Sequence, residues 1–281
     1  MKNTEYAVIG GDGRMAILAK MLEREGGCRL FFNGGATFPE KRDLEDARAV
    51  ILPVPCSFDG VHLNCTADAP PLTDITSLIG EGTVLFGGRL PEGVKELCTA
   101  RKIPCHDLLE DEALLLENAA LTAEGALEIL LCELPRSIRG AEVLVFGFGR
   151  IGQALARCLV PLGAQVSVAA RSDSQLSLAR CMGCTSLSLS DPSLCKRIGS
   201  VPWDAAINTV PARIFGLGLL KAMPKGMPYV ELASGGGVSE AEATLHGIRR
   251  INAPGLPGRT APESAAKIIY ERITDLIKRQ I

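Results

Sequence analysis

The sequence has few aromatic residues, few histidines and no excess of charge of either sign. Aromatic residues make up 4% of its 281 residues, and there are one tryptophan and three histidines. The formal net charge of -2 excludes the basic field that nucleic acid or an anionic membrane would attract. No apolar run approaches the roughly 18–20 residues that span a bilayer. Asp12 and Arg14 interrupt the first apolar stretch, unlike a secretory signal. We therefore expect a cytoplasmic protein that binds neither nucleic acid nor membrane.

The ten cysteines form no metal-binding pattern. Only Cys181 and Cys184 have the spacing of a metal-ligand pair, and no second pair or nearby histidine completes a zinc site. Reduced thiols that fill small gaps in the core are the simplest interpretation. We predict no metal site.

Apolar sequence, in contrast, is abundant and regularly spaced. Hydrophobic residues make up 47% of the chain, and its length suits two domains. Short apolar runs alternate with helical patterns, which is typical of parallel sheets with crossover helices. In the first part of the chain the expected strands are 6–9, 29–32, 49–54, 83–86 and 102–106. In the second part they are 142–146, 165–170, 203–208, 228–232 and 249–252. The expected helices are 15–25, 150–162, 174–182, 217–223, 237–246 and 262–278.

We therefore predict an α/β fold with two parallel-sheet domains. Residues 1–109 form a three-layer, flavodoxin-like domain, and residues 136–261 form a Rossmann dinucleotide-binding domain. Between them, residues 110–135 form a connector in which Thr122 is expected to cap a helix. The long amphipathic helix that begins at residue 262 has one apolar side, which must pack against a domain.

The motif GFGRIG at residues 147–152 predicts the dinucleotide site. A strand precedes it, a helix follows it and a second strand comes about 20 residues later. Gly147 allows the tight turn, Gly149 lets a pyrophosphate approach the backbone, and Gly152 lets helix and strand pack closely. The helix N-terminus then faces the phosphates, with Phe148, Arg150 and Ile151 in the same turn.

The end of the second strand favours NADP over NAD. An NAD enzyme usually carries an acidic residue there, which binds the ribose 2′-hydroxyl. This chain instead has Ala170, Arg171 and Ser172, and a guanidinium with a hydroxyl suits a 2′-phosphate. NAD stays open as an alternative, because a small loop shift would bring Asp173 to the ribose. We expect further cofactor contacts at the ends of the next strands, where ligands of open α/β sheets lie. These residues are Asn208, Thr209, Val210, Pro211, Ala233 and Ser234.

A second glycine turn, GGDGR at residues 10–14, lacks the dinucleotide spacing. Asp12 stands where a pyrophosphate would lie, which argues against a second nucleotide. A helix N-terminus beside an arginine nevertheless suits a small carboxylate. We predict that Gly11, Asp12, Gly13 and Arg14 bind an anionic substrate.

These motifs together resemble the A subunit of dipicolinate synthase. The similarity covers nearly the whole chain: AVIGGDGR, AVILPVP, ENAALTAEGAL, VFGFGRIG, AARSD, INTVP, ELASGGG and APGLPGRTAPESA. The resemblance implies a substrate domain joined to a Rossmann domain, with the C-terminal helix 262–281 packing back on the first domain. It also implies a role in spore formers. Together with the flavoprotein-like B subunit of dipicolinate synthase, such an enzyme converts a dihydrodipicolinate-type intermediate to pyridine-2,6-dicarboxylate, with NADP as the hydride acceptor. Two positions depart from the family's pattern: Leu121 stands where a proline is expected, and the ASGGG loop has no intervening proline.

The implied chemistry removes a hydride and a proton from a ring that carries two carboxylates. Arg14, Arg89 and Arg259 are the candidate carboxylate clamps, because each stands at a strand end or in a glycine-rich loop. His62 is a candidate proton acceptor. Asn118 and Thr122 are candidates for hydrogen bonds to the substrate.

Two other functions are compatible with the same sequence. One is an NADP dehydrogenase of another small carboxylate, of the shikimate or 2-hydroxyacid type. The other is a non-enzymatic protein that senses NADP through a partner. Assembly into a homo-oligomer is also left open.

Overall fold

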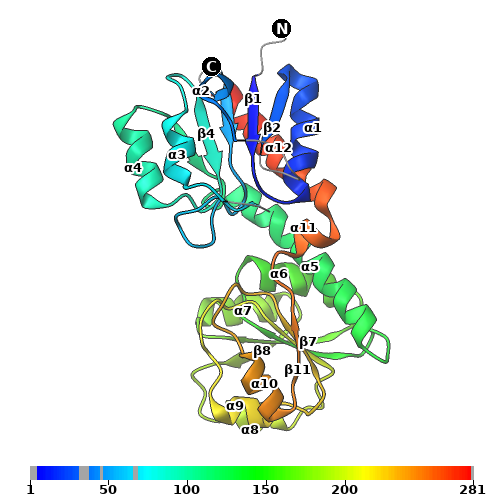
Figure 1. The fold of residues 1–281 in the computed structure, drawn as a ribbon. Coiled ribbons are helices and arrows are strands. Elements are labelled where there is room, and N and C mark those ends of the chain that lie inside the picture. Colours follow the sequence, from blue (N-terminus) through cyan, green and yellow to red (C-terminus); the bar gives the residue numbers. More distant parts are fainter. Residues whose placement is uncertain (1–4, 32–37, 45–46, 66–68, 280–281) are drawn as a thin grey trace. The chain divides into compact units, whose positions relative to one another are not determined.

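The computed structural model describes residues 5–31, 38–44, 47–65 and 69–279, and it contains two compact units (Figure 1). Unit 1 combines Met1–Asn118 with Ala261–Ile281, and unit 2 is Ala119–Thr260. Each unit has its own parallel sheet and its own apolar core, so the predicted α/β class with two parallel-sheet domains is confirmed.

The sheet of unit 1 has the strand order β2-β1-β3-β4-β5, and every neighbouring pair is parallel. Its strands are β1 (Tyr6–Ile9), β2 (Cys28–Phe31), β3 (Ala49–Ile51), β4 (Val84–Gly87) and β5 (Cys105–Asp107). Most ends agree with the sequence prediction within two residues; the prediction ran past β3, and it began β5 three residues early. The predicted end of the second strand, Phe32, lies outside the described residues. The central strands are completely buried, as expected for a sheet covered on both faces.

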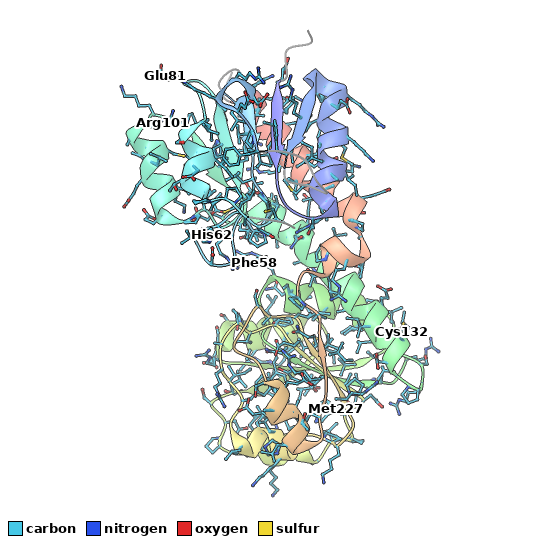
Figure 2. All side chains as sticks on the ribbon, viewed as in Figure 1. Phe58, His62, Glu81, Arg101, Cys132 and Met227 are labelled. Atoms are coloured by element: carbon cyan, nitrogen blue, oxygen red, sulfur yellow. The ribbon has the colours of Figure 1, made fainter. Side chains whose placement is uncertain are left out.

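Helices cover both faces of this sheet. They are α1 (Gly13–Gly26), α2 (Lys41–Leu44), α3 (Leu72–Ser77), α4 (Glu92–Ala100) and α12 (Pro262–Arg279). Arg101, which follows α4 (Figure 2), donates hydrogen bonds to the carbonyl oxygens of Thr76 and Ile79 and so ties α4 to α3.

The C-terminal helix α12 packs against α1 on one face of the first sheet, as predicted (Figure 1). Ile269, Ile273 and Ile277 belong to the same buried cluster as Val8 and Leu18. Burying a side chain of this size stabilises a fold by roughly 1.5–3 kcal/mol. The core of unit 1 therefore depends on residues from both ends of the chain.

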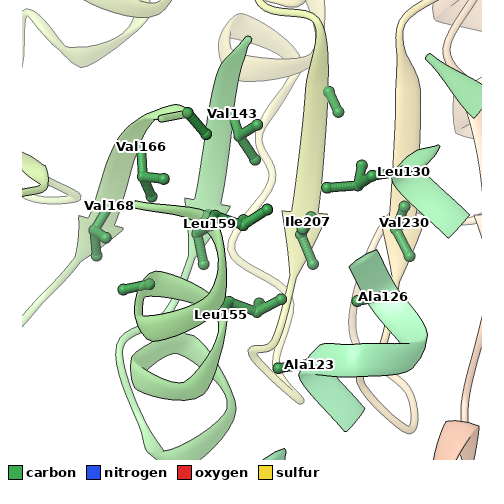
Figure 3. Packing of buried hydrophobic residues seen from close by; sticks show 14 of the residues in the cluster. Ala123, Ala126, Leu130, Val143, Leu155, Leu159, Val166, Val168, Ile207 and Val230 are labelled. Atoms are coloured by element: carbon green, nitrogen blue, oxygen red, sulfur yellow. The ribbon is translucent and has the colours of Figure 1, made fainter. Parts of the chain in front are cut away.

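The sheet of unit 2 has the strand order β11-β10-β9-β6-β7-β8, and its neighbouring strands are parallel. The strands are β6 (Glu142–Phe146), β7 (Gln165–Ala170), β8 (Thr185–Ser188), β9 (Ala205–Asn208), β10 (Pro228–Glu231) and β11 (Arg249–Asn252). Counted along the chain, this is the 3-2-1-4-5-6 order of dinucleotide-binding domains. Figure 3 shows the core on one face, where Val143 and Ile207 of the sheet meet Leu155 of a crossover helix.

The helices of unit 2 are α5 (Glu112–Glu133, whose first turns belong to unit 1), α6 (Arg150–Leu159), α7 (Asp173–Cys181), α8 (Leu194–Gly199), α9 (Leu217–Ala222), α10 (Glu240–His246) and α11 (Leu256–Thr260). The sequence analysis missed β8, α8 and α11 of unit 2, and it also missed α2, α3 and α4 of unit 1. It assigned α11 to a loop because of its Gly and Pro content.

Thr122 does not cap a helix, which corrects the sequence prediction. It lies in the middle of α5, and only 7% of it is exposed. The helix starts instead after Asp111, whose Oδ1 accepts the backbone N–H of Leu114 at 3.0 Å. Gly125 keeps α5 close to α11, because a Cβ there would lie 2.9 Å from the hydroxyl of Thr260.

Among the described residues, no helix is both long and apolar enough to cross a membrane.

Candidate functional site

The glycine turn of unit 2 is shaped to hold a dinucleotide. It lies between β6 and α6, and Gly147 has a φ of +89°, which favours glycine. A Cβ on Gly147 would lie 2.5 Å from Thr209 Oγ1, and one on Gly152 would lie 2.3 Å from the carbonyl oxygen of Gly147. A Cβ on Gly149 would meet no heavy atom within 4 Å. The turn is therefore closed behind Gly147 and Gly152 and open at Gly149, where a pyrophosphate approaches in this fold.

The other residues of this turn have different surroundings. Phe148 is fully buried in the core of unit 2, so only its backbone can face a bound dinucleotide. Ile151 packs against the same core. Arg150 is exposed in the first turn of α6, at the helix end that favours anions.

An exposed polar corner follows β7. Arg171, Ser172, Asp173 and Ser174 are all exposed, and α7 begins at Asp173. The hydroxyls of Ser172 and Ser174 lie 2.6 Å apart. Arg171 forms no ion pair with any residue that the structure describes. A guanidinium, two hydroxyls and a helix N-terminus can together bind a phosphate, and one nearby carboxylate opposes this.

A buried polar network lies behind the ends of β9 and β10. Asn208 Nδ2 donates to Glu231 Oε1 at 2.8 Å, and the hydroxyl of Tyr229 donates to Glu231 Oε2 at 3.0 Å. Glu231 Oε1 also accepts the N–H of Ala233 at 3.2 Å. Asn208 Oδ1 accepts the N–H of Val210 at 3.1 Å. Burial, reinforced by the neighbouring Glu231 carboxyl, raises the pKa of Tyr229.

This network holds the predicted cofactor loops in place. The side chain of Asn208 is fully buried and hydrogen-bonded to Glu231, so it supports the cofactor loops from inside the domain. Val210 and Ala233 are half-buried, and Pro211 and Ser234 are exposed at that edge. Thr209 donates from its hydroxyl to the carbonyl oxygen of Phe146 at 2.8 Å and so closes the glycine turn. Sequence reasoning missed Glu231, although a carboxylate that ends a buried strand is a usable signal.

In unit 1, the turn at residues 10–14 follows β1 and leads into α1. Gly10 and Gly11 have positive φ angles, and Asp12 caps α1 by accepting the N–H of Arg14 at 3.0 Å. The guanidinium of Arg14 binds the same carboxylate through Nε at 3.0 Å and Nη2 at 2.8 Å. Its Nη2 also donates to the carbonyl oxygen of Val54 at 2.8 Å. Nε and Nη2 of Arg14 are therefore already bonded within the protein. Nη1 has no hydrogen bond to any described residue, so it is the nitrogen with which Arg14 would bind the predicted anion.

The loop at residues 53–64 is fastened to this turn. The N–H of Gly11 donates to the carbonyl oxygen of Asn64 at 2.8 Å, and Asn64 Nδ2 donates to that of Pro55 at 2.9 Å. His62 lies on this loop, half of its side chain is exposed, and its Nδ1 contacts Asp59. The structure thus places His62 and the turn that carries Gly11, Asp12, Gly13 and Arg14 at one edge of the first sheet.

Arg89 follows β4 at the same edge. Its φ is +56° and its side chain is exposed. The carboxylate of Asp107, at the end of β5, accepts the backbone N–H groups of Arg89, Leu90 and Leu109 at 2.7–2.9 Å. Asp107 therefore fixes the unusual backbone of Arg89, and the sequence analysis did not single it out.

The remaining candidates are distributed over both units. Arg259 is exposed on α11 of unit 2, where it lines a hollow with Glu128 and Glu133 of α5. Asn118 ends the part of α5 that belongs to unit 1, and Thr122 belongs to unit 2. The structure thus brings Arg14, Arg89 and His62 to one edge and leaves Arg259 in the other unit. No cluster of metal-ligating side chains occurs in the described ranges.

The strand order and the glycine turn of unit 2 define the class. Unit 2 is the dinucleotide-binding domain of an NAD(P)-dependent oxidoreductase fold. Residues 129–245 match the family described as D-isomer specific 2-hydroxyacid dehydrogenase, NAD binding domain. Residues 5–109 match the family of the N-terminal domain of the dipicolinate synthase A subunit.

Relatives that match the whole chain are more specific. The dipicolinate synthase A subunit of Bacillus subtilis (strain 168) is 28% identical over 97% of this chain and 95% of its own length. The crystal structure of the dipicolinate synthase A subunit from Bacillus halodurans is 26% identical, with a TM-score of 0.82 and 98% of each chain covered. That of the dipicolinate synthase A chain from Bacillus subtilis is also 26% identical, with a TM-score of 0.83 and 100% and 99% of the two chains covered. These comparisons confirm the resemblance to the A subunit of dipicolinate synthase over the full length of the chain.

Proposed function

We propose that this protein oxidises a dihydrodipicolinate-type intermediate to dipicolinate, with NADP as the hydride acceptor, in the cytoplasm of a sporulating cell. The flavoprotein-like B subunit of dipicolinate synthase acts with it. The observation that carries the proposal is the match of residues 5–109 to the N-terminal domain of the dipicolinate synthase A subunit. This part of the chain contains the turn at residues 10–14, Arg89 and His62, whereas the dinucleotide domain alone suits many substrates.

The cofactor residues fit a dinucleotide on the geometry of the turn. Gly147, Gly149 and Gly152 form a cradle that added side chains would fill or distort. NADP, when bound, takes up the hydride that leaves the substrate ring. Arg171 and Ser172 support the choice of NADP, because the end of β7 carries no carboxylate before Asp173.

The substrate residues would hold a ring with two carboxylates. Nη1 of Arg14 and the exposed guanidinium of Arg89 offer cationic partners at one edge of the first sheet. Arg259, Asn118 and Thr122 remain further candidates for the second carboxylate. Since the product is aromatic, the step is favourable, and fixing the ring in position would supply much of the rate.

The direct test supplies dihydrodipicolinate enzymatically, adds NADP and follows the absorbance of dipicolinate, with and without a flavoprotein-like partner. Formation of dipicolinate that depends on this protein and on NADP is the expected result. NADP-dependent turnover of shikimate-type or 2-hydroxyacid substrates instead would favour the rival dehydrogenase function. Tight NADP binding with no turnover of any of them would favour a sensor.

Arg14 gives a residue-level test of the substrate edge. Replacing Arg14 with alanine should lower kcat/KM for the dicarboxylate by roughly ten- to a hundredfold, since one charged hydrogen bond is lost. The dissociation constant of NADP should stay nearly unchanged, because Arg14 lies in unit 1 and the glycine cradle in unit 2. Asp12→Asn is the matched control for the ion pair: it keeps Arg14 and the cap and should retain more activity. A nucleotide phosphate bound at residues 10–14 would contradict the assignment of the two turns.

A further inference from the structure

The loop at residues 53–64 contains a carboxylate that holds a histidine ring from one side. Asp59 Oδ2 lies 2.7 Å from His62 Nδ1. Its other oxygen, Oδ1, accepts the backbone N–H groups of Val61 and His62, both at 2.8 Å, and the hydroxyl of Ser57 at 2.9 Å. The Ser57 hydroxyl in turn accepts the N–H of Gly60 at 2.9 Å. Each oxygen of Asp59 thus has its own partners within the loop, although the Asp59 side chain is 55% exposed.

These contacts fix which nitrogen of His62 carries the proton. Hydrogen bonds, first of all that from the His62 side chain, hold the pKa of Asp59 below its usual range, so Asp59 is an acceptor only. In a neutral imidazole, Nδ1 must then be the donor, and Nε2 is left with its lone pair. A carboxylate that fixes the tautomer in this way is what a histidine general base requires.

The pair stands where a ligand of a parallel sheet would lie. The loop follows β3 at the carboxyl ends of the strands and is bonded to the turn at residues 10–14. Phe58 and Val61, on either side of Asp59, are 80% and 54% exposed. Figure 2 shows Phe58 and His62 at the same end of unit 1. Apolar and aromatic surface beside the imidazole suits a flat ring substrate.

The other two histidines lack this arrangement. His106 is half-buried and stacks on Phe86, with 5.3 Å between the ring centroids. His246 ends α10 in unit 2, and its Nε2 is buried. Among the described histidines, His62 is the one that combines a carboxylate on one ring nitrogen with half of its side chain exposed.

We propose that His62 accepts the proton in the oxidation as the catalytic residue, and that Asp59 is its positioning residue. The assignment rests on the proposed function. One C–H bond of the ring breaks and its electron pair leaves with the hydride to the nicotinamide. The C–H bond on the neighbouring ring carbon breaks, its proton goes to His62 Nε2, and its electron pair forms the new ring double bond. Asp59 stays ionised and faces the imidazolium that results.

The first test needs no activity. In protein labelled with ¹⁵N-histidine, at mildly alkaline pH, long-range ¹H–¹⁵N spectra report the tautomer of each ring, and His62→Ala identifies the His62 signals. We expect the Nδ1–H tautomer in the parent protein. In Asp59→Asn, the new carboxamide keeps an oxygen for the backbone N–H groups but turns an N–H toward His62. The tautomer should therefore change to Nε2–H. An Nε2–H tautomer in the parent protein would overturn the proposal.

The second test is a double-mutant cycle on dipicolinate formation. His62→Ala should lower kcat by about 10²-fold or more, the usual contribution of a general base. Asp59→Asn should lower kcat as well, and the double variant should be no slower than His62→Ala. KM should change little. Ser57→Ala, which disturbs the loop but leaves the contact with His62, is the control and should lose less than Asp59→Asn. If the losses in kcat of the two single variants multiply in the double variant, the two residues do not act as a pair. That result, or an unchanged kcat in His62→Ala, would overturn the proposal. An inactive parent protein would instead count against the proposed function and leave the tautomer result standing.

Discussion

Arg171 is the residue on which the choice between the two dinucleotides depends. It is exposed at the end of β7, beside two serine hydroxyls and the start of α7. Arg171→Ala should weaken NADP binding by roughly ten- to a hundredfold, as expected for one charge-assisted hydrogen bond, and leave NAD binding nearly unchanged. Titrations of both cofactors measure this. Arg180→Ala is the matched control, because Arg180 lies on the adjacent helix α7 and its guanidinium is bonded to Ser177 and Ser186. Equal losses for NADP and NAD would show that Arg171 does not bind the 2′-phosphate.

The glycines of the dinucleotide turn make a second test at this scale, because their surroundings differ. Gly152→Ala would place a Cβ 2.3 Å from a backbone carbonyl oxygen, so the turn must shift. We expect loss of cofactor binding together with a lower melting temperature of unit 2. Gly149→Ala would meet no heavy atom within 4 Å, so it should reduce dinucleotide binding without lowering that temperature. Retained NADP affinity in Gly152→Ala would contradict the assigned turn.

Sequence patterns predicted these residues unequally. The glycine turn at residues 147–152 is a local motif, so its spacing and the flanking strands were sufficient to predict a turn between a strand and a helix. The ion pair between Arg14 and Asp12 was not predicted, although the two residues are only two positions apart. A sequence pattern does not show that the Arg14 side chain turns back onto the Asp12 carboxylate. Glu231 was missed because its partner Asn208 is on another strand.

At the scale of elements, the sheets were predicted best. Their central strands are continuous apolar runs, since both faces are buried. Helix starts were harder to locate. Thr122 has the right chemistry for a cap, but the apolar sequence around it extends α5 in both directions, and Asp111 caps that helix instead. The helix α11 was missed because close packing against Gly125 favours a helix that local propensity does not.

The attachment of α12 to unit 1 includes one partly buried ion pair. Arg272 Nε lies 2.5 Å from Asp111 Oδ2, and their side chains are 21% and 14% exposed. Burial raises the pKa of Asp111, but the backbone N–H of Leu114 and the Arg272 guanidinium lower it more, so it ends below its usual value of 3.8. The pair therefore stabilises the folded state above pH 3.8, and this contribution is lost as the pH falls further.

Arg272→Met should accordingly destabilise unit 1 by about 1.5–3 kcal/mol at neutral pH. Parent and variant should converge as the pH falls below 3.8. Lys267→Gln is the matched control on the same helix, because its pair with Glu271 is exposed and should contribute only about 0.3–0.5 kcal/mol. Far-UV circular dichroism follows both units, whereas Trp203, the single tryptophan, reports on unit 2 alone. If Arg272→Met changes only the unfolding transition that is followed by tryptophan fluorescence, the assignment of this ion pair to unit 1 is contradicted.

At the scale of the whole molecule, the two units differ in continuity. Unit 2 is one uninterrupted segment with its own core, whereas unit 1 needs both chain ends. A fragment of residues 110–260, which keeps α5 whole, should fold and bind the dinucleotide with an affinity close to that of the full chain. Cofactor titration monitored by Trp203 fluorescence measures this. A folded fragment without affinity would show that unit 1 contributes to the dinucleotide site.

The position of α12 also sets an order of events on the ribosome. The strands and the other helices of the first unit are synthesised early, but α12, which covers one face of their sheet together with α1, emerges only after all of the second unit. At about 5–20 residues per second, the delay is roughly 7–30 s. During that time the apolar cluster of Val8, Leu18 and Ile51 lacks the α12 side chains that complete it, so part of this face stays uncovered, while the second unit can already complete its fold. The domain that is translated first is therefore the one that finishes folding last, and nascent chains stalled before residue 262 should bind chaperones through this face.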